Sequence, residues 1–400
     1  MLIKAFKAKQ NVDQSEAVYY AQRFLERILF LFFAQDNGLI DNPKLFTKRV
    51  LNQLKLRQCT EDSRKIFDDI KLLFKALDKG SKVLGIDGFN GELFSGTAIP
   101  EKVHFLDFQT KAFFAKEKQN LIRAAFKSAC IAEIKALKPG NVHVFSNGHG
   151  MTVEDFMVSA KISAEEISAI GISLGERIFN SVSKTVEQVG CNTNLGIILL
   201  CAPISQALFS KQGTINIKNI QNSLNGLLAD LSVEDTKLTY KAIRLASPGG
   251  LGKKDKYDIQ QDPNTSLLKT MQHAEKYDRI AYQYTHKFKD IFNFGVPIIK
   301  KKLGEKLGLR WSATVVYIAF LAHLIDTHIV RKFSEKTAIN VSKEAKILEK
   351  LVRKTKKPEE IIPKLIKFDK KLKKNGINPG TSADLTVASL FVTLLQEFKE

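Results

Sequence analysis

Residues 138–150 read Lys-Pro-Gly-Asn-Val-His-Val-Phe-Ser-Asn-Gly-His-Gly, directly after an amphipathic run over 121–137 and before a second helical run. Lys138 precedes Pro139, and the first helix is predicted to end there because a residue before proline avoids the α region. Gly140 is one of three glycines that allow positive φ or a close approach to a ligand. The stretch therefore predicts two helices joined by a polar loop, which is either an ordinary connection or a binding loop.

Apolar residues recur with a helical period along most of the chain, and no strand pattern of any length competes with it. We expect an all-α protein, with a helical bundle domain over 116–400 preceded by a smaller helical domain over 1–115. In the N-terminal part, helices are expected over 13–36, opened by an Asp13–Glu16 capping box, and over 43–56 and 61–78. In the larger domain they are expected over 118–137, 160–189 (long or broken) and 267–288, with an apolar central helix over 311–325. Two exposed helices within 331–374 are expected to divide near Pro358, and a closing helix is expected to be capped by Thr381 or Ser382. Residues 102–116 are expected to form a connector.

Composition points to a soluble cytoplasmic protein. The N-terminus lacks the apolar segment of a secretory signal, and the longest uncharged stretch, 188–210, is broken by polar residues, so no membrane association is expected. The four cysteines show no metal-binding spacing and suit a reducing compartment.

The net charge of +20 is concentrated in residues 331–374, where sixteen Lys or Arg residues face six Asp or Glu residues. Such a surplus attracts polyanions, so a nucleic-acid partner is one interpretation. Few aromatic residues accompany the lysines, which favours a solvated helix face instead.

The first 110 residues contain Arg27-Ile-Leu-Phe-Leu-Phe-Phe-Ala-Gln-Asp-Asn-Gly-Leu-Ile40 and Phe89-Asn-Gly-Glu-Leu-Phe94. This segment resembles the N-terminal helical region of restriction-modification DNA methylases. The chain has no Asn-Pro-Pro-Tyr-type motif and no glycine-rich methyl-donor loop, so methylase activity is not expected.

One candidate residue lies just before the 138–150 loop, and a candidate binding turn lies at the start of a later helix. Glu133 is one turn before Pro139 and is expected to point toward the loop. The Asn192-Thr193-Asn194 turn opens an apolar helix, where free N–H groups favour an anion. Capping of that helix by Thr193 or Asn194 explains the same residues without a ligand.

A second glycine loop follows at 247–258, Ser-Pro-Gly-Gly-Leu-Gly-Lys-Lys-Asp-Lys-Tyr-Asp. It is not a P-loop, but Gly249 and Gly250 with the following lysines suit a backbone nest for phosphate. Asp255 and Asp258 are carboxylates that suit Mg²⁺, although such loop aspartates are usually only solvated.

The end of the central helix and the last loop carry further charged groups. Asp326 and Arg331 form either a structural pair or part of a site, because buried charges need partners. Asn378-Pro-Gly-Thr-Ser-Ala-Asp384 places Ser382 at the start of the closing helix, as a cap or a phosphate ligand, and Asp384 in its first turn. The expected core face of this helix is Leu385, Ala388, Phe391, Val392 and Leu395.

Four motifs occur in a fixed order over about 118–397: Lys138-Pro-Gly-Asn-Val, Cys191-Asn-Thr-Asn-Leu-Gly, Asp326-Thr-His-Ile-Val-Arg-Lys and Asn378-Pro-Gly-Thr-Ser-Ala-Asp-Leu. This set resembles the triphosphoribosyl-dephospho-CoA synthase family. The resemblance implies transfer of the triphosphoribosyl group of ATP to 3′-dephospho-CoA with release of adenine, and Mg²⁺ accompanying ATP.

The resemblance also implies roles for the candidate residues. Lys138 and Mg²⁺ would neutralise phosphates, and the 192–194 turn would hold phosphate or ribose. Glu133, Asp326 or Asp384 would supply metal ligation or the acid–base step, and their order is left open. The candidate site residues are Glu133, Asp326 and Asp384 as catalytic groups; Lys138, Gly140, Asn141, Asn192, Thr193, Asn194, Gly249, Gly250, Arg331 and Ser382 as substrate or phosphate ligands; and Asp255 and Asp326 as metal ligands.

One motif departs from the branch of the family that serves citrate and malonate decarboxylases, which carries Asn-Thr-His-Lys-Gly where this chain has Asn192-Thr-Asn-Leu-Gly196. Ser247-Pro-Gly-Gly-Leu-Gly and Asp278-Arg-Ile-Ala-Tyr-Gln-Tyr284 are similar to an archaeal and methylotroph branch. The alternatives are therefore a related cofactor-biosynthesis enzyme with another nucleotide or a C1-carrier (pterin) precursor as substrate, and a nucleic-acid-associated module.

Overall fold

The computed structural model describes residues 106–210 and 217–397. The chain divides into two units between Lys116 and Glu117, and the second unit holds nearly all of the described residues. The helices expected at 13–36, 43–56 and 61–78 lie outside the described residues, as does most of the predicted 1–115 domain.

Helices build this part of the chain, and no strand occurs within it beyond isolated bridges in the 138–150 loop and its flank. The elements in chain order are α5 (Leu106–Lys135), α6 (Val153–Ile167), α7 (Leu174–Val189), α8 (Leu195–Ser210), α9 (Ile217–Ala229), α10 (Val233–Ala246), α11 (Leu267–Ala274), α12 (Arg279–Thr285), the π-helical η1 (Asp290–Gly295), α13 (Val296–Gly304), α14 (Gly308–His323), α15 (Thr327–Lys332), α16 (Glu335–Lys354), the 3-10 turn η2 (Pro358–Glu360), α17 (Ile362–Lys374) and α18 (Gly380–Glu397). The all-α prediction is confirmed.

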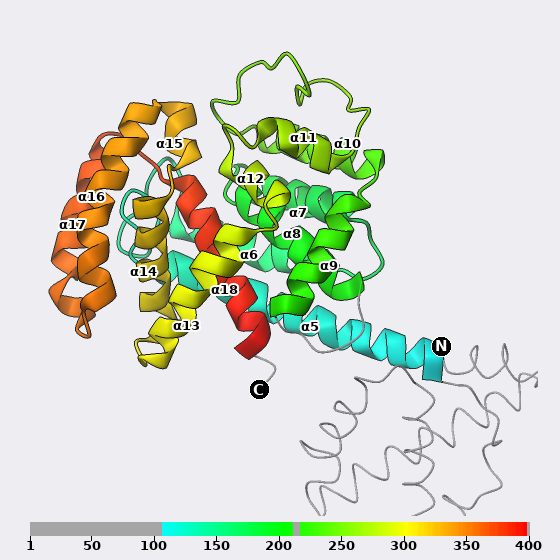
Figure 1. Ribbon diagram of the computed structural model, residues 1–400, viewed down its shortest axis with the longest axis horizontal. Coiled ribbons are helices and arrows are strands. Elements are labelled where there is room, and N and C mark those ends of the chain that lie inside the picture. Colours follow the sequence, from blue (N-terminus) through cyan, green and yellow to red (C-terminus); the bar gives the residue numbers. More distant parts are fainter. Residues whose placement is uncertain (1–105, 211–216, 398–400) are drawn as a thin grey trace, which may run out of the picture. The chain divides into compact units, whose positions relative to one another are not determined.

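Two apolar helices form the centre of the bundle. Every residue of α14 from Trp311 to Ala322 is buried, which confirms the expected central helix. α18 contacts α8, α13 and α14, and its predicted core residues Leu385, Ala388 and Phe391 are buried. Figure 1 shows α18 passing between α8 and α12 on one side and α13 and α14 on the other. Through α14 and α18, elements that are far apart in the sequence come into contact.

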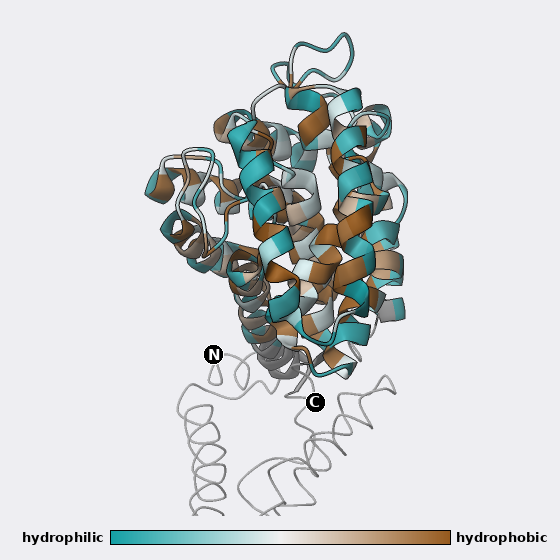
Figure 2. Ribbon diagram, turned by 90° about the vertical axis from the view of Figure 1, so that its left-hand side faces the viewer, coloured by the Kyte–Doolittle hydropathy of each residue, from teal (hydrophilic) through white to brown (hydrophobic). Residues whose placement is uncertain are grey.

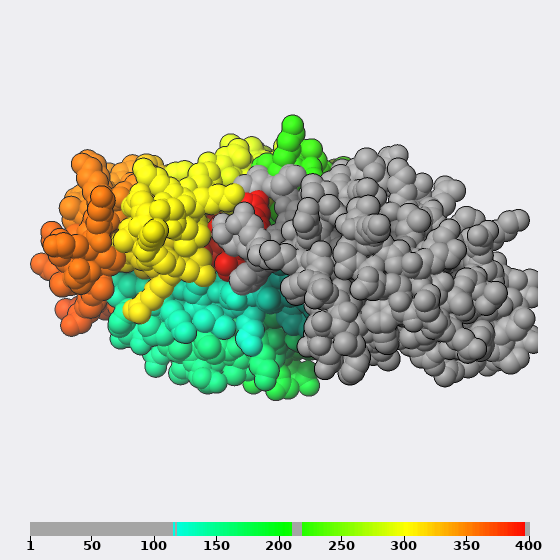
Figure 3. Space-filling model, turned by 90° about the horizontal axis from the view of Figure 1, so that it is seen from below, coloured from blue at the N-terminus to red at the C-terminus, as the bar shows by residue number. Residues whose placement is uncertain are grey.

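The lysine-rich segment forms the outer helices α16 and α17, and the split at Pro358 is confirmed because η2 begins there. Figure 2, which looks onto this side, shows hydrophilic and hydrophobic ribbon segments alternating along the helices, as amphipathic helices require. In the space-filling view of Figure 3 they form the end of the unit beyond α13. α16 and α17 therefore bury one face and expose their lysines.

The structure corrects two expected element boundaries and decides a third that was left open. The expected connector over 102–116 is helical from Leu106, where α5 begins. Of the two alternatives for 160–189, a long or a broken helix, the broken form is confirmed, because α6 ends at Ile167 and a capping box at Ser173 starts α7. The expected helix over 267–288 is interrupted where Asp278 caps α12. Of the helices that the structure describes, none has the length and hydropathy to cross a membrane.

Candidate functional site

A cavity of about 460 Å³ lies where α5, α8, α11, α15 and α18 approach one another. Its volume falls in the range of small-molecule sites. Carboxylates, cations, histidines and rings all reach its wall. These are Glu133, Asp258, Asp278 and Asp384; Lys254, Arg331 and Lys332; His149, His273 and His328; and Tyr240, Tyr257 and Tyr277.

Asp384 is the carboxylate most available to a ligand. Among the described residues no group donates a hydrogen bond to it, and it lines the cavity as the fifth residue of α18, just after the first turn. Burial raises its pKa well above the usual value, the negative charges of Glu133 and Asp326 raise it further, and Arg331 opposes them. A carboxylate with a raised pKa is suited to accept a proton near neutral pH.

Gly196 makes room for this carboxylate at the start of α8. A Cβ on Gly196 would lie 2.0 Å from Asp384 Oδ2, so no other residue fits there without displacing Asp384. The carboxylate thus lies against the N-terminal turn of α8, where the helix dipole favours a negative charge. Gly380 is required in the same way, because a Cβ there would lie 2.1 Å from His328 Nδ1.

Glu133 points toward the 138–150 loop, as predicted, and its contact there is Lys138. The two form a buried ion pair, and Lys138 Nζ also donates to Asn141 Oδ1 at 2.9 Å. Burial raises the pKa of Glu133 and lowers the pKa of Lys138, and each charge opposes the other's shift. Lys138 is fully buried and does not line the cavity, so the structure does not place it against a ligand's phosphates.

Asp326 caps two helices instead of facing the cavity. Its Oδ1 accepts from the backbone N–H groups of His328 and Ile329, and its Oδ2 accepts from the backbone N–H and hydroxyl of Ser382 at 2.8 Å each. Its side chain is buried and does not pair with Arg331, so the expected Asp326–Arg331 pair is wrong. Neither Asp326 nor Ser382 lies on the cavity wall, and together they lock α15 onto α18.

The 192–194 turn lines the cavity, and its residues have separate tasks. Asn192 Oδ1 accepts from the backbone N–H of Leu195, the first residue of α8, at 3.2 Å, so this N–H is satisfied by the Asn192 side chain and not by Thr193 or Asn194. Thr193 Oγ1 lies 2.6 Å from Ser159 Oγ, and Asn194 Nδ2 donates to Ser163 Oγ at 2.7 Å. Both serines belong to α6. The serines therefore fix the turn beside the cavity.

Arg331 ties the second glycine loop to α15. Its Nε donates to the carbonyl of Gly249 at 3.0 Å, and its Nη1 lies 3.7 Å from Asp278 Oδ2. Gly250 has a φ of +82°, and a Cβ there would lie 2.9 Å from the Arg331 carbonyl oxygen. Because its side chain is still 23% exposed, Arg331 keeps access to a ligand at the cavity wall.

Asp255 and Asp258, the loop carboxylates suggested for Mg²⁺, do not face the cavity together. Asp258 is buried and accepts the backbone N–H groups of Lys254 and Gln260 at 2.7 and 2.8 Å, which lower its pKa. Asp255 is exposed and does not line the cavity. The described residues contain no group of three His, Cys, Asp or Glu side chains arranged to hold a metal ion.

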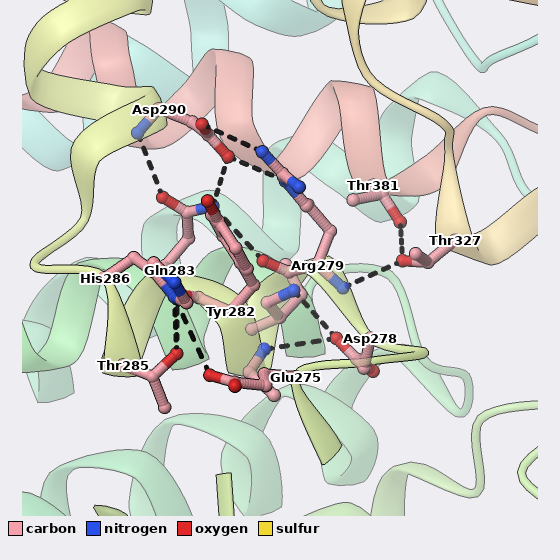
Figure 4. A network of polar contacts seen from close by, with 12 residues as sticks. Glu275, Asp278, Arg279, Tyr282, Gln283, Thr285, His286, Asp290, Thr327 and Thr381 are labelled. Atoms are coloured by element: carbon pink, nitrogen blue, oxygen red, sulfur yellow. Dashed lines mark hydrogen bonds and ion pairs between the residues drawn. The ribbon is translucent and has the colours of Figure 1, made fainter. Parts of the chain in front are cut away.

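A polar network supports the wall formed by α12 and α15 (Figure 4). Asp278 caps α12, while the Arg279 guanidinium forms a two-point contact with Asp290 at 2.8 and 3.1 Å. The backbone N–H of Arg279 donates to Thr327 Oγ1, which contacts Thr381 Oγ1. The chain of contacts joins α12, α15 and α18, so these helices hold Asp278, Arg331 and Asp384 on one wall.

The structure places many of the candidate residues from the sequence on the cavity wall, and others away from the cavity. Those that line the cavity are Glu133, Asn141, Asn192, Thr193, Asn194, Gly249, Arg331 and Asp384. Lys138, Gly140, Gly250, Asp255, Asp326 and Ser382 do not line it. Sequence reasoning did not single out Asp278, His328, Lys332 and the tyrosines as site residues, although Asp278, His328 and Lys332 lie within or beside the quoted motifs.

Models of known families match two parts of the chain. Residues 119–400 match the family described as ATP:dephospho-CoA triphosphoribosyl transferase. Residues 20–94 match the MmeI helicase spacer domain, in agreement with the resemblance of the N-terminal segment.

Among solved structures, the chain is similar to a crystal structure from Archaeoglobus fulgidus described as a triphosphoribosyl-dephospho-CoA synthase. The similarity has 21% identity and a TM-score of 0.46, and it covers 60% of this chain and 98% of that one. The curated proteins gave no significant match.

Proposed function

The chain belongs to the ATP:dephospho-CoA triphosphoribosyl transferase family, and on that basis we propose that it moves the triphosphoribosyl group of ATP to 3′-dephospho-CoA with release of adenine. One observation supports this most directly. The cavity has a free carboxylate, Asp384, against the α8 N-terminus, and cations on the wall formed by α15 and the second glycine loop. Transfer of a phosphorylated sugar needs both kinds of group.

In the proposed reaction the ribose 2′-hydroxyl of the acceptor attacks the anomeric carbon of ATP and loses its proton. The bond from that carbon to adenine breaks, and adenine leaves with the electron pair and takes up a proton. Charge builds on the sugar as this bond breaks, so a nearby carboxylate stabilises it. We assign the hydroxyl proton to Asp384, because Glu133 and Asp326 are already held by other groups.

The triphosphate would lie against Arg331, Lys332 and Lys254. All three line the cavity, and Arg331 is held in place through Gly249. Guanidinium and ammonium groups bind phosphate through charge-assisted hydrogen bonds. Lys138 has no part in this step because its ammonium is buried with Glu133 and Asn141.

The residues present suit a Mg²⁺ ion that arrives with ATP. Mg²⁺ in nucleotide sites uses one or two carboxylates together with phosphate oxygens and water, so a three-carboxylate cage is not needed. Asp278 is the cavity carboxylate that would hold it, since only its Oδ1 caps α12. Glu133 is paired with Lys138, Asp258 accepts two backbone N–H groups, and Asp384 is assigned the proton. The ion would supply positive charge to the triphosphate.

Adenine release tests the proposal. The full chain is incubated with ATP and Mg²⁺, with and without 3′-dephospho-CoA, and adenine is measured by chromatography. We expect adenine only when the acceptor is present, and a loss of about 10²–10⁴-fold in Asp384→Asn. Asp255→Asn is the matched control, because Asp255 is exposed and outside the cavity wall. No adenine from the wild-type chain, or full activity in Asp384→Asn, would contradict the proposal.

A related enzyme with another acceptor is the second candidate. Leu195 lines the cavity at the position where the resemblance implies a lysine in the decarboxylase branch, so one wall is apolar where a cation would face the substrate. Adenine release that requires a different nucleotide or a pterin precursor would favour this candidate over transfer to 3′-dephospho-CoA.

A further inference from the structure

Ring side chains gather on a part of the cavity that the proposed transfer chemistry does not use. Tyr257, His273 and Tyr277 all line the cavity. The rings of Tyr257 and His273 meet edge to face with centroids 5.4 Å apart, and Tyr277 remains 42% exposed. Aromatic side chains left exposed within a cavity are suited to a planar ligand, because stacking needs an open ring face.

The turn that carries Tyr257 is held in a costly conformation. Tyr257 has a φ of +55°, which is uncommon for a bulky residue and persists where the surroundings enforce it. Buried Asp258 accepts two backbone N–H groups across this turn, and the Tyr240 hydroxyl donates to the Tyr257 carbonyl at 2.9 Å. These contacts fix the direction in which the Tyr257 ring leaves the loop.

A cation lies beside the same group of rings. Lys254 Nζ is 4.2 Å from the centre of the Tyr277 ring, within the range of a cation–π contact. Lys254 is exposed, lines the cavity and comes from the loop whose Gly249 is bound by Arg331. Rings on the cavity wall next to a cationic loop match the two chemical parts of a nucleotide, which are a planar base and phosphates.

We propose that Tyr257, His273 and Tyr277 form a subsite for the adenine ring of a nucleotide, with Lys254 directed toward its phosphates. The assignment rests on the proposed function. ATP and 3′-dephospho-CoA both carry adenine, so the ring chemistry is common to the two substrates and the experiment must separate them.

The test is a set of binding titrations with the full chain. The wild type, Tyr277→Ala and Tyr277→Phe are titrated with Mg²⁺-ATP, with 3′-dephospho-CoA and with Mg²⁺-tripolyphosphate, which has no base. Loss of one stacked base weakens binding by about 5- to 150-fold. We expect this loss in Tyr277→Ala for one adenine nucleotide, nearly wild-type affinity in Tyr277→Phe, and unchanged binding of tripolyphosphate. The nucleotide that is weakened identifies which adenine the subsite holds.

His273→Ala provides a second variant on an exposed position if Tyr277→Ala fails to fold. Unchanged affinity of both nucleotides in the Ala variants, or an equal loss for tripolyphosphate, would overturn the subsite and leave the transferase proposal standing. Ring-dependent nucleotide binding without adenine release would overturn the transferase proposal and retain the subsite.

Discussion

The two glycine loops of this chain have similar compositions and different surroundings. In the 138–150 loop, Gly140 N–H donates to Asp369 at 2.8 Å and the Asn141 amide donates to Asn378 at 2.8 Å, while Lys138 is buried with Glu133. In the 247–258 loop the lysines are exposed. The first loop is bound by the protein itself, whereas the second keeps its cations available.

Lysine, glycine and asparagine in a loop therefore do not by themselves identify a ligand site. A buried polar group must be bonded, and protein groups satisfy those of the first loop before any ligand arrives. The second loop is held mainly at Gly249 and Asp258, so its lysines are exposed, and Lys254 lies on the cavity wall against the Tyr277 ring. We therefore expect substitutions in the first loop to change stability and substitutions in the second to change binding.

The largest difference in the free energy of unfolding is expected between substitutions of Lys138 in the first loop and of Lys254 in the second. Lys138→Met removes one partner of a buried ion pair and leaves Glu133 uncompensated, so the free energy of unfolding should fall by about 3–5 kcal/mol. Lys254→Met, at an exposed position, should change it by no more than about 0.5 kcal/mol. Urea unfolding at pH 7 measures both. Similar small losses in the two variants would mean that the buried pair does not stabilise the loop.

A smaller difference in the free energy of unfolding is expected between two glycines with positive φ, Gly140 in the first loop and Gly252 in the second. Gly140 has a φ of +85°, and a Cβ there would lie 2.9 Å from Leu372 and Pro379 atoms; Gly252 has a φ of +63° and open space around it. Gly140→Ala should cost about 2–4 kcal/mol, because backbone strain and crowding add.

Gly252→Ala should cost only the backbone strain, about 1–2 kcal/mol. Thermal unfolding of the two variants, converted to free energies, makes the comparison. Equal costs would show that crowding around Gly140 is relieved by small shifts of its neighbours.

The smallest effect is expected in the pH dependence of the first loop. Burial alone would raise the pKa of Asp369, but hydrogen bonds from His143 and Gly140 and the charge of Lys373 lower it below the usual 3.8. A lowered folded-state pKa adds stability that is present above the unfolded pKa and is lost as the pH falls through the folded pKa.

Asp369→Asn should therefore lower the free energy of unfolding by about 1–2 kcal/mol at pH 7 and reduce its fall below pH 3.8. Acid titrations of unfolding check this, with Asp255→Asn in the second loop as the control. A variant with the same acid profile as the wild type would contradict the role of Asp369.

Sequence reasoning was most successful where the pattern is local. The apolar period identified α14 and the core face of α18, and Pro358 marked the division between α16 and α17. It was least successful at caps inside long apolar runs. Asp278 and Ser173 start new helices there because their side chains accept backbone N–H groups, and a polar residue within a helical period does not reveal that choice.

The same limit applies to the site. Asp384, Arg331 and the 192–194 turn were predicted from residue type and motif, and they line one cavity. Asp326 carries an equally suggestive carboxylate, yet both of its oxygens are used by α15 and Ser382. The rings of Tyr257 and Tyr277 were not predicted as site groups, because only the fold of the 247–258 loop against α11 puts them on the cavity wall.

The local residue pattern was sufficient to predict the helical class, the positions of the polar loops and the set of motifs that indicates the family. Which polar groups serve the fold and which face the cavity depends on the tertiary structure. The reason is that the deciding partners are far away in the chain. Lys138, Gly140 and Asn141 belong to one short stretch, but they are satisfied by contacts that include Asp369 and Asn378, more than two hundred residues later.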